Sequence, residues 1–294
     1  MDRGFNPSNI SINLLDNLMD DYELFQLLLN SQFFQNRFVQ RAASHLSNTF
    51  TSERINTIVD SLSGIISNEM PRHINRWGNL DGIHSMDNWQ DNLDEIKQFS
   101  QERNNIVLSQ INNELDLNGT VQVIVNVHPV GSGKILINDV PLINPERAGS
   151  YFKDNPISIA AYSLPGYEFV GWQGNSDSTI IHYDCIVDSS FTALFQSSEE
   201  IILPEVLTQN TLLTNSQPYV VNQNLIISSE IALTIQEGVE IRMLEGSNII
   251  VEGQLIIEGI EDNPVQIIPH ASIGENRWGS ICINNGSELS NISH

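Results

Sequence analysis

The spacing of apolar residues changes twice along the chain, near Gly119 and near Ser198. Before Gly119, apolar side chains recur every three or four residues, which is the period of an amphipathic helix. From Val121 to Val127 every second residue is apolar, which is the period of a strand with one buried face. Beyond Ser198 the alternation continues only in short runs that glycines interrupt. The pattern therefore predicts three regions, over residues 1–117, 118–197 and 198–294.

The first region is predicted to be all-helical. Thr51 stands where a helix-capping residue is expected, directly before a strongly amphipathic run, and Pro71 marks a kink or a restart. The helices are expected over residues 22–29, 34–46, 55–66 and 87–115.

The second region is predicted to be a small antiparallel β module. Turn residues at 129–133 and 165–166 separate alternating runs, and the last run ends at Phe195. In the third region the strands are too short for a typical sandwich and no helix lies between them, so a coiled solenoid of stacked strands is favoured, with a sandwich as the alternative. Because the chain ends at Ser293-His294 within one turn of this solenoid, the sequence is expected to be a fragment or a truncated reading frame.

The chain is strongly acidic, with 36 acidic and 13 basic side chains and a net charge of −23. This charge repels phosphate backbones and anionic lipids, so nucleic acid and membrane surfaces are unfavourable partners. No run of eighteen apolar residues is present, so no membrane insertion is expected, and the first fifteen residues lack the features of a signal peptide. Solubility is the preferred reading of the charge, ahead of cation binding or a saline habitat.

Residues 1 to about 115 resemble the C-terminal end of the kinase fold of the spore-coat-H (CotH) kinase family. The resemblance rests on Leu29 to Phe34, Arg37-Phe38, the Thr51 cap with Ile55 to Glu69, Arg76-Trp77, Trp89, and Phe99 with Arg103. It implies a helical, kinase-like C-terminal subdomain.

The same resemblance bears on the first residues of the chain. The family looks like an atypical protein kinase, in which an Asp-x-Asp followed by Gly-Phe holds Mg²⁺ against the nucleotide. Asp2, Gly4 and Phe5 match the end of this motif, with Asn6 where glycine is commoner. By resemblance Asp2 would be the second magnesium-binding carboxylate of an incomplete site; a solvated terminal residue is the alternative. The first aspartate and the nucleotide pocket would precede Met1, so Mg²⁺ and ATP are expected as cofactors only with such an upstream lobe, and no catalytic residue is assigned here.

The two β regions resemble other modules. Residues 118–197 look like a divergent internalin-type repeat of bacterial surface proteins, on motifs that include Pro165-Gly166-Tyr167, Gly171-Trp172 and Thr192 to Phe195. Residues 198–294 resemble the N-terminal part of a right-handed parallel β-helix, on motifs such as Glu237 to Ile241 and Arg277 to Gly279. These resemblances imply a spacer or an adhesive module.

Several segments that resemble functional sites are interpreted as structural features. Gly131-Ser132-Gly133-Lys134 lacks the glycine and hydroxyl of a phosphate loop, because His128 and Ile135 occupy those positions, so a hairpin turn is predicted. The seven histidines fall singly, which does not favour a metal site. Facing carboxylates would be needed for glycoside hydrolysis, and aromatic residues would bind sugars only if exposed together. The carboxylates considered are Glu237, Glu240, Glu252, Glu258 and Asp262, and the aromatic residues are Tyr167, Trp172, Tyr219 and Trp278.

The preferred hypothesis is a non-catalytic, structural or adhesive segment of a secreted or cell-surface bacterial protein with several domains. Its partner would be a protein or a glycan at the cell surface. The alternative is part of a CotH-family kinase whose catalytic lobe lies upstream, and a further alternative is a glycan-binding β module.

Overall fold

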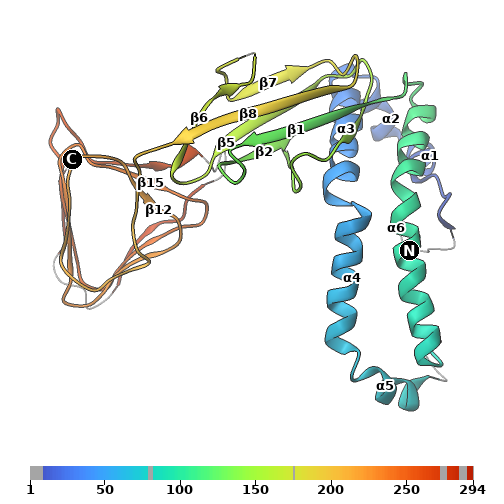
Figure 1. Ribbon diagram of the computed structural model, residues 1–294, viewed down its shortest axis with the longest axis horizontal. Coiled ribbons are helices and arrows are strands. Elements are labelled where there is room, and N and C mark those ends of the chain that lie inside the picture. The colour runs from blue at the N-terminus through green and yellow to red at the C-terminus, as the bar shows by residue number, and fades with distance from the viewer. Residues whose placement is uncertain (1–8, 79–81, 175, 272–276, 285–289, 294) are drawn as a thin grey trace. The chain divides into compact units, whose positions relative to one another are not determined.

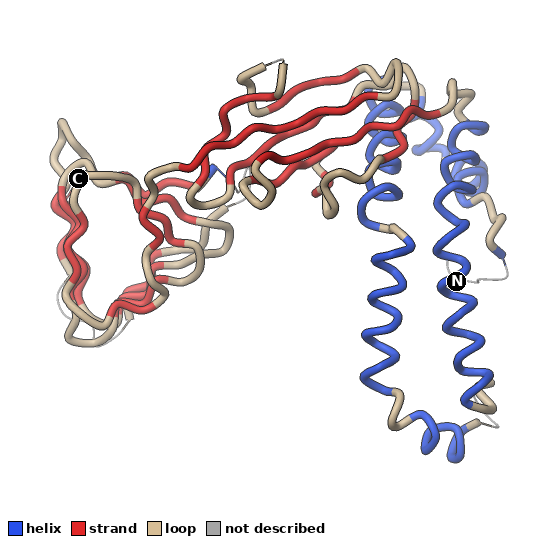
Figure 2. The backbone as a smooth tube through the Cα atoms, viewed as in Figure 1, coloured by secondary structure: helices blue, strands red, loops and turns tan. Residues whose placement is uncertain are grey.

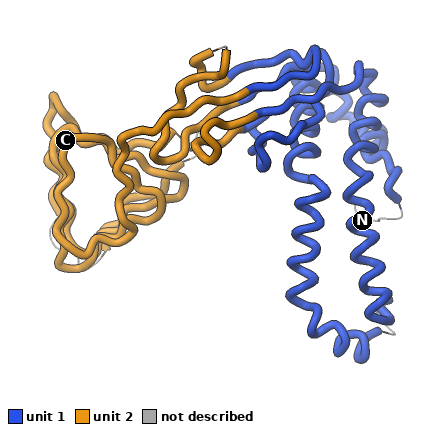
Figure 3. The backbone as a smooth tube through the Cα atoms, in the orientation of Figure 1, with its two compact units in different colours: residues 1–125, 136–159, 181–191 blue, residues 126–135, 160–180, 192–294 orange. Residues whose placement is uncertain are grey.

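The computed structural model describes residues 9–78, 82–174, 176–271, 277–284 and 290–293, with a helical region followed by a region of strands (Figure 1). The chain divides into two compact units (Figure 3). The first unit comprises residues 1–125, 136–159 and 181–191, and the second comprises residues 126–135, 160–180 and 192–294.

The helical region confirms the predicted class. Side-chain oxygens of Asn13, Ser31, Thr51 and Ser85 cap four of the helices by accepting from the backbone N–H three residues ahead. The Thr51 cap was predicted, and Pro71 starts a new helix rather than kinking an old one. The elements are α1 (Leu14–Asp21), α2 (Glu23–Leu29), α3 (Gln32–Ser44), the π-helical turn η2 (His45–Thr49), α4 (Ser52–Ile66), α5 (Met70–Trp77) and α6 (Met86–Glu114).

Helix α4 contacts α6 along its polar edge. Lys97 Nζ lies 2.6 Å from a carboxylate oxygen of Asp60, and Ser100 Oγ donates to Asn56 at 3.3 Å. Much of the apolar stripe of α4 remains exposed, including Leu62 at 60% and Ile65 at 75%.

The strands between residues 120 and 197 form two four-stranded sheets with orders β4-β1-β8-β6 and β3-β2-β5-β7. As the alternation predicted, β1 buries its valines at every second position. Strands β1 and β4, β2 and β3, and β6 and β8 pair antiparallel. The strands are β1 (Thr120–His128), β2 (Gly133–Ile137), β3 (Val140–Pro141), β4 (Gly149–Phe152), β5 (Ile157–Ser163), β6 (Tyr167–Trp172), β7 (Ile180–Tyr183) and β8 (Ser189–Ser197).

The remaining strands form three parallel sheets, and consecutive strands along the chain belong to each of the three sheets in turn. Figure 2 shows these strands as short segments joined by loops. The sheet orders are β18-β15-β12-β9, β10-β13-β16-β19 and β11-β14-β17-β20. Parallel pairing of such short strands excludes the antiparallel sandwich alternative. The strands are β9 (Ile201–Ile202), β10 (Val206–Leu207), β11 (Thr211–Leu213), β12 (Tyr219–Val221), β13 (Leu225–Ile227), β14 (Ala232–Gln236), β15 (Glu240–Met243), β16 (Ile249–Val251), β17 (Gln254–Glu258), β18 (Gln266–Pro269), β19 (Ile281–Ile283) and β20 (Asn291–Ser293).

Inside this three-sheet coil, equivalent apolar residues stack in columns. Leu213 pairs with Ile235, which in turn pairs with Ile257, and all three side chains are at most 5% exposed. Asparagines bridge successive corners: Asn224 accepts from the Asn248 side chain at 2.9 Å, and Asn248 accepts from the Ser280 N–H at 2.8 Å. Ile283 is 51% exposed on β19, the last strand of its sheet among the described residues.

Candidate functional site

Helix α3 and the turn η2 present a polar stripe to strand β4. Gln40, Ser44 and Asn48 follow one another at intervals of four residues, which places them on one helical face. They are 1%, 0% and 6% exposed, respectively. A buried polar face is stable only when its hydrogen bonds are made inside the protein.

Gln40 makes these bonds with backbone. Its Nε2 donates to the carbonyl oxygens of Phe152 at 2.8 Å and Asn155 at 2.5 Å, and its Oε1 accepts from the Phe152 N–H at 3.0 Å. Asn48 donates to the Ser44 carbonyl at 3.0 Å and to the Tyr151 hydroxyl at 3.4 Å. These contacts fix α3 against β4 within the first unit.

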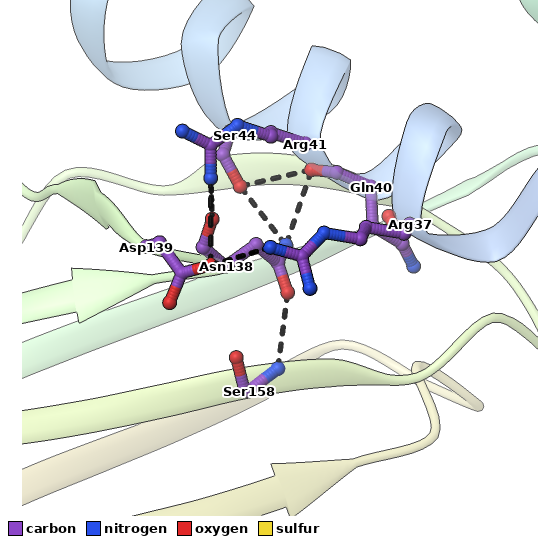
Figure 4. Close-up of polar contacts among 7 residues, drawn as sticks. All are labelled: Arg37, Gln40, Arg41, Ser44, Asn138, Asp139 and Ser158. Atoms are coloured by element: carbon purple, nitrogen blue, oxygen red, sulfur yellow. Dashed lines mark hydrogen bonds and ion pairs between the residues drawn. The ribbon is translucent and has the colours of Figure 1, made fainter. Parts of the chain in front are cut away.

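Asn138 connects the same helix to the following strands (Figure 4). Its Nδ2 donates to the Gln40 carbonyl at 3.1 Å and to Ser44 Oγ at 3.0 Å, while its Oδ1 accepts from the Ser158 N–H at 3.0 Å. Asn138 and Asp139 have φ values of 52° and 64° and form the two-residue turn between β2 and β3. Asparagine and aspartate adopt this left-handed backbone more readily than most residues.

Two arginines of α3 share the carboxylate of Asp139 (Figure 4). Nη2 of Arg37 lies 3.3 Å and Nη1 of Arg41 lies 3.5 Å from Oδ2 of Asp139, and Nη1 of Arg41 also donates to the Asn138 carbonyl at 2.9 Å. The Arg37 and Asp139 side chains are 61% and 66% exposed, so their ion pair adds little stability. The arrangement leaves one positive charge in excess.

A pocket of about 260 Å³ opens beside this group. One wall is the exposed side chain of Phe33, one turn before Arg37 on the same helix face. The lining residues are Phe33, Asn36, Arg37, Gln40, Asn138, Asp139, Pro156, Ile157, Ser158 and His182.

The second unit contains a buried ionic group around Glu200. This carboxylate is 2% exposed; Arg242 Nη1 donates to it at 2.5 Å, the Gly166 N–H donates at 2.9 Å, and His270 Nε2 lies 3.5 Å away. Arg242 Nε also donates to Glu240 at 2.5 Å. Glu200 ends the polar run Ser197-Ser198-Glu199-Glu200, and its side chain can be buried because its charge is neutralised and its oxygens are hydrogen-bonded.

Burial shifts several pKa values. Desolvation opposes ionisation of Glu200, but the Gly166 N–H and Arg242 outweigh it, so the pKa of Glu200 lies below its usual value. Desolvation lowers the pKa of His270, and it raises the pKa of Tyr151 and of Cys185 to about 12. Tyr151 and Cys185 are therefore neutral structural groups, and a neutral Cys185 thiol is a poor nucleophile.

The candidate residues named from the sequence lie in separate parts of the chain. Asp2 lies outside the described residues. Residues 129–132 form a turn, with the Ser132 hydroxyl donating to the Pro129 carbonyl at 2.6 Å, as predicted for the glycine-rich segment. Trp172 and Tyr219 are 4% and 6% exposed and pack in cores. They therefore do not form a shared aromatic surface with Tyr167 and Trp278.

Of the carboxylates left open by the sequence, Glu237 and Glu258 line one polar pocket together with Asn215, Gln236 and Asn263. Glu240 is instead paired with Arg242. Within the described ranges, no group of three or more metal-ligating side chains is found, and no helix is long and apolar enough to span a bilayer.

Sequence reasoning missed Gln40, Asn138, Asp139 and the burial of Glu200. The polar spacing of Gln40, Ser44 and Asn48 was visible, but the helix over residues 34–46 was predicted from its apolar stripe, which includes Phe34 and Phe38. That stripe does pack, with the Phe38 ring 5.3 Å from the ring of Phe25. The Asn138-Asp139 pair between two alternating runs was a usable turn signal.

The helical region is similar to a known family. A family described as CotH kinase protein matches residues 13–107, which is the helical region. The helical region is thus similar to CotH kinase proteins, in agreement with the resemblance seen in the sequence. No curated protein and no solved structure matches the chain.

Proposed function

We propose that this chain is a non-catalytic structural or adhesive segment of a secreted or cell-surface bacterial protein with several domains. The observation that supports it most is the buried contact of Gln40 with the backbone of Phe152 and Asn155. Through this contact, part of the β module belongs to the same compact unit as the CotH-like helices. A fixed connection of this kind suits a scaffold that holds its modules in place.

The finer fold assignments belong to the same proposal. Residues 118–197 act as an internalin-type repeat, and residues 198–294 act as the first turns of a right-handed parallel β-helix. The alternating burial of β1 and the three parallel sheets support these assignments. Both module types are consistent with a spacer at the cell surface whose partner is a protein or a glycan.

The second candidate is a part of a CotH-type protein kinase, and the family match over residues 13–107 favours it. In that case ATP and Mg²⁺ would be cofactors of the complete domain, and Asp2 would contribute to the metal site.

Calorimetry with ATP and Mg²⁺ tests the two candidates. We expect no saturable heat for this chain up to millimolar nucleotide, because the structural role needs no phosphate site. An ATP affinity in the micromolar range, lost in the Asp2→Asn variant, would overturn the structural proposal in favour of the kinase. The Asp16→Asn variant, which removes an acidic residue from α1, controls for the change of charge.

A further inference from the structure

We propose that the pocket beside α3 binds the C-terminal residue of a peptide, with its carboxylate on Arg37 and an apolar side chain against Phe33. This site goes beyond the proposed structural role, which needs no ligand. All residues that line the pocket belong to the first unit.

The charge of the site favours a carboxylate. Arg37, Asp139 and His182 are the titratable residues of the lining, and Arg41 adds a second guanidinium on Asp139. The local excess of positive charge contrasts with the net charge of −23 of the chain. Within the described part of the chain, Nε and Nη1 of Arg37 have no hydrogen-bond partner, so they are available to a carboxylate, whose two oxygens match a guanidinium.

The walls of the pocket favour an apolar body over a sugar. Phe33 is 75% exposed, and Pro156 and Ile157 line the same space. Covering an exposed aromatic ring with an apolar side chain is favourable because both surfaces leave water. The pocket of about 260 Å³ lies below the usual size of drug-like ligand sites, about 300–1,000 Å³, and therefore suits a single residue.

The polar floor of the pocket is already fixed. The side-chain amides of Gln40 and Asn138 already donate to and accept from other groups of the protein. They hold α3 and the turn at 138–139 in place, so little ordering is required when a ligand binds. Recognition therefore falls to Arg37 and Phe33.

Two probes that differ only in the carboxylate test the inference, namely N-acetylphenylalanine and N-acetylphenylalaninamide, each titrated by NMR against the full chain. We expect the carboxylate to bind at least about tenfold more tightly than the amide, and Arg37→Gln to remove this difference. Asp139→Asn should tighten binding, since it removes a competing acceptor from Arg37 while keeping a residue that tolerates the positive φ. The exposed Arg72→Gln variant, with the same change of charge, should behave like the parent chain.

Several outcomes would overturn the inference. Equal binding of acid and amide would exclude carboxylate recognition, and weaker binding by Asp139→Asn would exclude the competition with Arg37. Glucuronate binding as tightly as N-acetylphenylalanine would assign the pocket to acidic sugars instead of peptide ends. Unchanged exchange of the Phe152 amide in each variant checks that α3 remains docked. None of these results bears on the structural role, which rests on Gln40.

Discussion

At the scale of single residues, Glu200 combines a buried charge with three donors of different kinds. Arg242 supplies a full charge, the Gly166 N–H supplies a fixed dipole, and His270 lies beside the same oxygen as Arg242. Removing one member of a buried ion pair is costly because the other charge is left uncompensated, whereas an exposed pair contributes little. Arg242 permits a direct comparison, since Glu240 binds the same guanidinium from a more exposed position.

We predict that Glu200→Gln lowers the free energy of unfolding by about 3 kcal/mol at pH 7. The pKa of Glu200 is lowered in the folded chain, so its contribution is present above its ordinary value of 4.5 and is lost as the pH falls through the lowered pKa. The difference between the parent chain and the variant should therefore shrink in acid. Urea unfolding at pH 7 and pH 3, with exchange of the Gly166 amide as a local readout, measures it.

Glu240→Gln is the matched control, because it changes the same charge on the same arginine. Its effect should stay within about 1 kcal/mol. Equal losses in the two variants would mean that burial of Glu200 has no special energetic role.

At the scale of elements, the docking of α3 depends on polar groups of the helix pairing with the backbone of a strand. Gln40 satisfies the Phe152 N–H and two carbonyl oxygens that would otherwise be buried without partners. An unpaired buried polar group costs more than a typical hydrogen bond contributes. The side chain therefore acts on three backbone groups at once.

We predict that Gln40→Ala destabilises the first unit by about 3 kcal/mol, with faster exchange of the Phe152 amide. The exposed Gln90 of α6, which donates to Asp94 on the same helix, provides the control. Gln90→Ala should change the unfolding free energy by less than about 0.5 kcal/mol. A Gln40→Ala variant as stable as the Gln90→Ala variant would show that other contacts hold α3.

The corners of the coil make a second prediction at this scale. A Cβ atom on Gly253 would lie 2.2 Å from the Ile231 carbonyl oxygen and 2.3 Å from that of Ser228, whereas one on Gly64 of α4 would meet nothing within 4 Å. Gly253→Ala should therefore destabilise the coil by about 2 kcal/mol. Gly64→Ala should stabilise its helix by about 0.5–1 kcal/mol. Thermal unfolding followed by circular dichroism compares them, and a neutral Gly253→Ala would contradict the close approach of backbone at this corner.

At the scale of the whole molecule, the changes of apolar period predicted a helical region followed by strands, and the structure confirms this order, because burial repeats with the geometry of each element. The valines of β1 and the columns of the coil follow from this rule. The first turn of the coil was harder to foresee: β9 and β10 have two residues each, too few for an alternation to be recognised.

The polar features could not be derived in the same way. Glu200 stands in a run of polar residues that normally marks solvent, and its burial depends on the Gly166 N–H and on Arg242 and His270, which lie 42 and 70 residues later. Gln40 likewise depends on backbone groups more than a hundred residues away. Partners separated so far along the chain do not produce a periodic pattern in the sequence.

The in-register columns of the coil determine how this part of the protein can change in length. From Ile201 to Tyr219, Ile241 and Ile267, the interval between stacked residues grows from 18 to 22 to 26 residues, yet each step places the next strand directly on the one before. Each step adds one strand spacing of about 4.8 Å whatever the length of its loops. Insertions of a few residues in the loops therefore leave the length of the coil along its axis unchanged. Duplication of a complete turn extends the coil by one fixed increment, so the length of the coil and the surface of its loops can evolve separately.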